Sequence, residues 1–105
     1  ALRIQELNDA FRRTMLGGRF ILTAGVRSMG SNKVSQLVQL VQLFHDFTTD
    51  NDPYGEHDFG AIEFDGQKIF WKIDYYDRTL TYGSEDPADP SRTVRVLTIM
   101  LASEY

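Results

Sequence analysis

The chain has 105 residues, of which 42% are hydrophobic and 25% charged, so we expect one globular domain spanning residues 1–105 and exclude global disorder. Cysteine is absent, which excludes disulfides, thiolate nucleophiles and cysteine-ligated zinc. The net charge of −4 is divided unevenly: residues 1–33 carry +4 and residues 34–105 carry −8. No basic stripe runs along the chain, so direct nucleic-acid binding through Arg12, Arg13 and Arg19 is disfavoured.

Neither a membrane span nor an export signal is expected. The longest apolar-rich stretch, residues 34–47, is interrupted by glutamines, His45 and Asp46, and is shorter than the roughly 20 apolar residues that a span needs. No secretory signal opens the sequence. Together with the lack of cysteine, this favours a cytoplasmic protein and no membrane partner.

The first third of the chain predicts two helices and a strand. Apolar residues at helical spacing predict an amphipathic helix over 2–14, which ends at Gly17-Gly18. The stretch "RFILTA" predicts a buried strand over 19–24. A second apolar stripe predicts a helix over 32–46 that packs on a sheet and begins at a Ser31 or Asn32 cap.

The next stretch predicts a long loop and a hairpin. Residues 48–58 are rich in Thr, Asp, Asn, Pro and Gly, and a connection of this length in a compact domain is often functional. Two strands follow in "GAIEFDGQKIFWKIDYYD", joined at Asp65-Gly66, where glycine readily supplies the positive φ of a tight hairpin turn.

Residues 91–103 admit two interpretations. The valines and threonines of "TVRVLTIMLA" favour a third consecutive strand. A helix capped by Asp89 with Pro90 at its first position is the alternative. With the strand, the fold class is α+β, with two helices packed on one face of a small, mainly antiparallel sheet of about four strands.

Strand alternation assigns the side chains of the hairpin to two faces. The face toward the helices takes Ile62, Phe64, Ile69, Trp71, Ile73 and Tyr75. The opposite face takes Glu63, Phe70, Lys72, Asp74, Tyr76 and, from the last strand, Thr98. This second face is either a solvated surface with exposed ion pairs or a binding surface.

The stretch "DPYGEHDFG", with Asp50 just before it, places His57 among the four carboxylates Asp50, Asp52, Glu56 and Asp58, and it is either a site or a well-built turn. Its aromatic side chains can anchor the loop on the sheet, so that Glu56 and His57 are presented beside the open face of the hairpin. The candidate binding residues are therefore Tyr54, Glu56, His57, Asp58, Glu63, Lys72, Asp74 and Tyr76.

No motif for a metal or a cofactor is present. Asp50, Asp52 and Gly55 fit positions one, three and six of a calcium loop, but position twelve is Ala61 where a bidentate glutamate is needed. The sequence has no nucleophile elbow, phosphate-binding glycine loop, dinucleotide fingerprint or HExxH. We therefore expect no cofactor and no metal, and the catalytic residues of any reaction stay unknown.

Several blocks resemble a family of small bacterial proteins of unknown function. They are "NDPYGEHDFG", "FWKIDYYD" and "RVLTIMLASEY", preceded by "LNDAFRRT", "GGR" and "LTAGV", and the similarity runs from about Leu7 to Tyr105. The resemblance implies a bacterial cytosolic origin and assigns no catalytic residue.

Two functions follow as hypotheses. The first is a non-catalytic bacterial binding module that acts on a protein partner and, in one version, mimics nucleic acid through its acidic surface. Its basis is the missing catalytic motifs and the uneven charge. The alternative is a small hydrolase or metal-assisted enzyme that uses His57 with nearby carboxylates.

Overall fold

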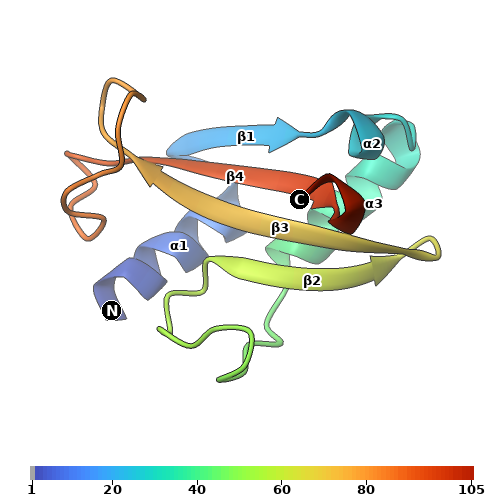
Figure 1. Ribbon diagram of the computed structural model, residues 1–105, viewed down its shortest axis with the longest axis horizontal. Helices are drawn as coiled ribbons and strands as arrows, with labels where there is room; N and C mark the ends of the chain where they lie inside the picture. Colours follow the sequence, from blue (N-terminus) through green and yellow to red (C-terminus); the bar gives the residue numbers. More distant parts are fainter. Residues whose placement is uncertain (1) are drawn as a thin grey trace.

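The computed structural model in Figure 1 describes residues 2–105. Its elements in chain order are α1 (Leu2–Thr14), β1 (Gly18–Leu22), α2 (Ala24–Arg27), α3 (Ser31–Gln42), β2 (Phe59–Phe64), β3 (Gln67–Tyr76), β4 (Val94–Leu101) and the 3-10 helix η1 (Ala102–Glu104). The helix predicted over 2–14 is confirmed by α1.

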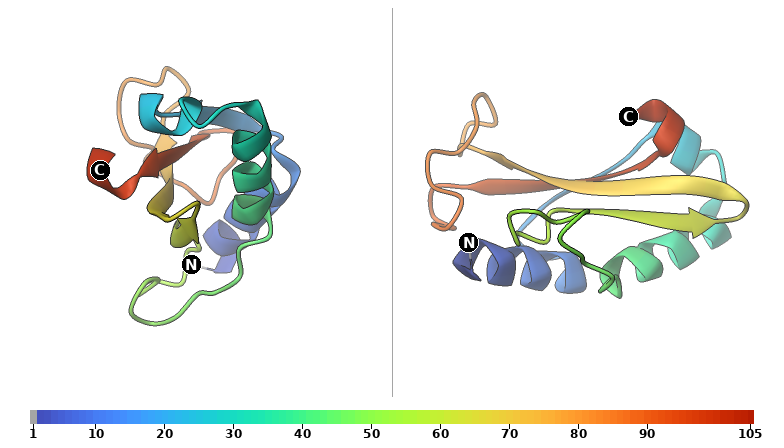
Figure 2. Two further views of the ribbon diagram at one scale, coloured as in Figure 1. Left: turned by 90° about the vertical axis from the view of Figure 1, so that its right-hand side faces the viewer. Right: turned by 60° about the horizontal axis from the view of Figure 1, so that its bottom comes forward.

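The four strands form one sheet in the order β1-β4-β3-β2. The pairs β2–β3 and β3–β4 are antiparallel, whereas β1 runs parallel to β4. The sheet is therefore mixed and mainly antiparallel, and the α+β fold is confirmed. The long helices α1 and α3 lie along one face of the sheet, while α2 and η1 lie together at one end of it (Figure 2).

The core lies between the sheet and the helices α1 and α3, and Trp71 is its largest fully buried side chain. The rings of Phe44 and Phe47 meet Trp71 edge-on, at centroid distances of 5.5 and 6.1 Å. A side chain on Gly60 of the neighbouring strand would collide with the indole nitrogen, so glycine is needed there for close approach. All six hairpin side chains predicted to face the helices belong to or pack against this core.

The hairpin and the last strand are confirmed. Asp65 and Gly66 both have positive φ, of 54° and 75°, as a tight hairpin turn requires. Residues 94–101 pair along their whole length with β3, so the helical alternative for this segment is wrong. Asp89 caps a local turn instead, because its Oδ1 accepts hydrogen bonds from the backbone N–H and the hydroxyl of Ser91.

Two element boundaries differ from the prediction. The strand predicted over 19–24 ends at Leu22, and α2 begins two residues later, where the Gly25 N–H donates to the side chain of Glu104. The helix predicted to residue 46 ends at Gln42, since Arg12 donates to three carbonyls at that end of the helix. Both boundaries depend on groups far away in the sequence.

The packing predicts unequal effects of two neighbouring substitutions. Trp71→Ala should lower the free energy of unfolding by roughly 3 to 5 kcal/mol, because a fully buried indole is lost. Lys72→Ala removes one exposed ion pair and should cost less than about 1 kcal/mol. Urea denaturation of both variants measures the difference, and equal losses would contradict the register of β3.

Candidate functional site

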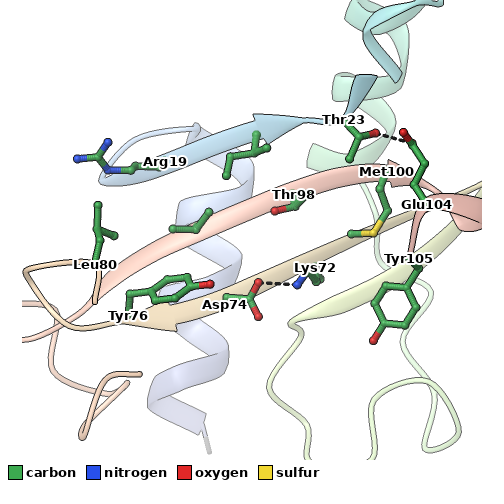
Figure 3. A pocket seen from close by; sticks show the side chains of 12 residues that line it. Arg19, Thr23, Lys72, Asp74, Tyr76, Leu80, Thr98, Met100, Glu104 and Tyr105 are labelled. Atoms are coloured by element: carbon green, nitrogen blue, oxygen red, sulfur yellow. Dashed lines mark hydrogen bonds and ion pairs between the residues drawn. The ribbon is translucent and has the colours of Figure 1, made fainter. Parts of the chain in front are cut away.

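The predicted site residues divide between two regions on opposite sides of the sheet. One is the α3–β2 loop, residues 43–58, which passes on the side of the sheet covered by α1 and α3 (Figure 2). The other is a trough on the opposite face, named here the open-face trough (Figure 3).

A hydrogen-bond network centred on buried Asn8 fixes one part of the loop. The Asn8 Nδ2 donates to the Glu56 carbonyl at 2.9 Å and to the Tyr75 hydroxyl at 2.8 Å, and its Oδ1 accepts from Arg95 Nε at 2.6 Å. The Tyr75 hydroxyl donates to Glu56 Oε1 at 2.8 Å. Burial and this hydrogen bond raise the pKa of Tyr75, so the phenol stays a neutral donor.

A second chain of contacts holds His57. Its Nδ1 lies 3.0 Å from Asp9 Oδ1, which also accepts from Arg12 Nη2 at 3.0 Å. Its Nε2 lies 3.6 Å from Asp52 Oδ2 on the other side of the ring. The imidazole stacks on Phe47 with centroids 3.8 Å apart and planes 3° apart. His57 is therefore fixed at Nδ1 and on one ring face, while its Nε2 only faces Asp52 beyond hydrogen-bond distance.

The backbone of the loop is shaped for these contacts. His57 has φ of 57°, an uncommon value for a residue with a side chain, and its N–H donates to Asp52 Oδ1 at 3.1 Å. Gly55, two residues earlier, also has positive φ, and its carbonyl accepts from Gln5 Nε2. The loop is thus an ordered structure that docks on α1.

Two predicted loop residues are not fixed in this way. The Tyr54 side chain is 80% exposed and extends into solvent. Asp58 is half-buried, and desolvation together with the charge of Glu56 raises the pKa of its carboxyl. Asp58 is therefore the carboxylate of the loop whose charge the fold disfavours.

The open-face trough has a volume of about 690 Å³ and lies over β1, β3 and β4 between the 77–93 loop and the C-terminal turn (Figure 3). Its polar lining residues are Arg19, Thr23, Lys72, Asp74, Thr98 and Glu104. Its larger apolar and aromatic lining residues are Ile21, Tyr76, Leu80, Val96, Met100 and Tyr105. Leu80 lies at one end of the trough and has a positive φ of 59°.

The charges in the trough are arranged along its length. Lys72 Nζ donates to Asp74 Oδ2 at 2.8 Å in the middle, and this hydrogen bond raises the pKa of Lys72. Arg19 lies at the opposite end of β1 from Thr23 and Glu104. The Glu104 carboxylate accepts from the Thr23 hydroxyl, which lowers its pKa. The trough therefore offers both signs of charge beside apolar surface.

The expectation that Glu56 and His57 lie beside Lys72, Asp74 and Tyr76 is wrong. Tyr75, which binds Glu56, faces the helices, and the three β3 residues of the trough alternate with it and face the other way. Tyr54 and Glu63 do not line the trough either. The carboxylates of the loop and the charges of the trough do not form one site.

Sequence reasoning missed the residues that hold the loop, namely Asn8, Asp9, Arg12 and Arg95. A signal was available, because Asn8 and Arg12 stand four apart and flank Phe11 on one face of the first helix. Arg12 is fully buried, so of the three arginines considered for nucleic-acid binding only Arg13 and Arg19 are on the surface.

Within residues 2–105, no group of three or more His, Asp or Glu side chains is arranged to hold a metal ion. Across the same residues, no helix combines the length and the apolar composition needed to cross a bilayer.

Comparison with protein families places residues 22–104 in one family, described as Protein of unknown function (DUF3768). The match covers well over half of the chain, so the chain belongs to this family. The matched part contains the loop and most of the trough, whereas Asn8, Asp9 and Arg12 precede it. Searches of the curated proteins and of the solved structures each found no match.

The contacts of Glu56 and His57 predict that they stabilise the fold. The double variant Glu56→Ala with His57→Ala should lower the free energy of unfolding by about 2 kcal/mol, since hydrogen bonds to Tyr75 and Asp9 are lost. Tyr54→Ala, in the same loop but exposed, should change it by less than about 0.5 kcal/mol. Chemical denaturation tests both, and a fully stable double variant would contradict a structural role.

The raised pKa of Asp58 predicts a pH effect. Between the ordinary value of 3.8 and the raised native value, the folded state binds more protons than the unfolded state, so stability falls as pH rises through this window. Asp58→Asn should therefore raise the melting temperature at neutral pH, and the gain should vanish below pH 3.8. Melting curves from pH 3 to 8 measure it; a gain independent of pH would contradict the assignment.

Proposed function

We propose that the protein is a non-catalytic binding module that holds a protein partner in the open-face trough. One observation carries the proposal: exposed charged and aromatic side chains converge on the trough, whereas the titratable side chains Glu56 and His57 of the loop are occupied in holding the fold. Exposed polar groups beside apolar surface are typical of recognition surfaces.

The lining of the trough indicates the chemistry of the partner. Ile21 and Tyr105 offer apolar area, and Arg19 and Glu104 place opposite charges at its two ends. An extended partner segment with apolar side chains and charges of both signs fits this arrangement. The version in which the protein mimics nucleic acid requires a mainly acidic surface, so the mixed lining favours it less.

The hydrolase alternative gains no support from the geometry of His57. Its carboxylate neighbours Asp9 and Asp52 come from α1 and from the loop itself, not from the hairpin, and His57 does not line the trough. A general base must reach a bound substrate, whereas Nδ1 of this imidazole contacts Asp9 and its ring is stacked on Phe47.

The proposed setting is the bacterial cytoplasm. The absence of cysteine from the sequence suits a reducing compartment, and the excess of acidic residues after residue 33 suits association steered by charge.

An exchange of the trough's ion pair tests the proposal without changing net charge. The double variant Lys72→Asp with Asp74→Lys reverses the pair in the trough, and the tagged chain is used to capture proteins from a bacterial lysate at low and moderate salt. Capture of the specific partner should fall about tenfold or more, because charges complementary to the partner are reversed.

The matched control exchanges a second exposed ion pair, which lies outside the trough. In this pair Arg92 Nη2 is 3.1 Å from Glu85 Oε2. This exchange should leave capture unchanged, and both double variants should melt close to the original chain. Absence of a partner at both salt concentrations, or equal capture by the two double variants, would overturn the proposal.

A further inference from the structure

We propose that two copies of this chain pair through the outer edges of their β1 strands, about a twofold axis at Phe20. The two four-stranded sheets then form one continuous sheet, in which the two β1 strands are antiparallel neighbours. The inference does not rest on the proposed function: Arg19, Ile21 and Glu104 line both the trough and this edge, but self-association is measured without any partner.

The free edge of β1 carries backbone groups suited to this pairing. Thr23 N–H donates inward to Ile99 O, so by strand alternation Arg19 and Ile21 also face β4, while Gly18, Phe20 and Leu22 direct their backbone groups outward. The outward Leu22 carbonyl already accepts from Arg27 Nη1 at 3.0 Å, so on pairing it must accept a second hydrogen bond, which the two lone pairs of a carbonyl oxygen allow. An antiparallel copy centred on Phe20 pairs Gly18 with Leu22 of the second copy, and Phe20 with Phe20.

The side chains along this edge are more apolar than an unpaired edge strand normally carries. Four of the five residues of β1 are exposed, including Phe20 at 36% and Ile21 at 48%, and Leu16 just before the strand is 74% exposed. Beneath the edge lies an apolar hollow of about 270 Å³, lined in part by Met15, Leu22 and Val38. Phe20 of the second copy would lie across Phe20, beside this hollow.

Charge complementarity identifies the occupant as a second copy. Arg19 lies near one end of β1 and Glu104, bonded to Thr23, lies near the other (Figure 3). An antiparallel copy reverses the ends, so Arg19 faces Ile21 of the second copy, and Thr23, whose hydroxyl is bonded to Glu104, lies two residues further, about 7 Å along the strand. The twofold axis creates this attraction twice.

The other edge of the sheet lacks these features. Strand β2 carries the charged side chain of Glu63, and its first residues follow directly from the docked loop. Glu63 is the one charged residue of β2, so an antiparallel copy brings no opposite charge from that strand to it, whereas Arg19 of β1 is brought toward the end that holds Glu104. Glu63→Lys on this edge is therefore a suitable control for variants on β1.

Sedimentation velocity of the full chain from about 1 to 500 µM tests the inference, since a short strand-pair interface predicts a concentration-dependent dimer. Ile21→Lys should raise the dimer dissociation constant about tenfold or more, and Glu63→Lys should leave it unchanged. A wild-type chain that stays monomeric throughout, or an edge variant that dimerises as well as wild type, overturns the inference.

A mixing experiment tests the register. Arg19→Glu and Glu104→Lys each turn both attractions into repulsions in a homodimer, so each variant alone should dimerise weakly. A mixture restores both attractions, and native mass spectrometry should then find mainly the heterodimer. Two folded variants that form no heterodimer overturn the inference. If melting shows that Glu104→Lys does not fold, the dimer dissociation constants of Ile21→Lys and Arg19→Glu test the inference instead.

Discussion

The buried guanidinium of Arg12 is the interaction on which the rest of the helical layer depends. It donates to the carbonyls of Val41, Gln42 and Phe44 at 2.9 to 3.0 Å, where the helix dipole of α3 is negative, and to Asp9 at 3.0 Å. Its Cζ lies 5.1 Å from the centre of the Trp71 ring. One side chain thus joins α1, the end of α3 and the centre of the sheet through its two terminal nitrogens, while its buried Nε has no hydrogen-bond partner.

This arrangement explains why the acidic loop is architecture. Asp9 is shared between Arg12 and His57, so the position of the imidazole follows from that of the guanidinium. A second buried cation, Arg95, acts similarly through Asn8, which in turn fixes the Glu56 carbonyl. Because both networks lie on the helical side of the sheet, the side chains left free for recognition are those of the opposite face.

The strand order places the open-face trough next to the free edge of β1. The last strand, β4, lies between β3 and β1, so the first and last strands of the chain are neighbours and β1 becomes an edge. The C-terminal turn then reaches β1, where Glu104 accepts from Thr23 and from the N–H of Gly25. Arg19 and Glu104 therefore lie both in the trough and beside the free edge, so pairing at β1 would place the troughs of two copies next to each other.

The sequence by itself determined the first helix, the hairpin turn at Asp65-Gly66 and the inward direction of Trp71, because periodicity and turn chemistry are local properties. It also favoured the last strand over a helix. The tertiary structure alone decided that Glu56 and His57 lie on the opposite side of the sheet from Lys72, because their partners Asn8 and Asp9 are about half the chain away in sequence. It likewise decided the end of α3 and the presence of α2, which depend on Arg12 and Glu104. Such contacts form only when distant segments are packed together, so no local pattern encodes them.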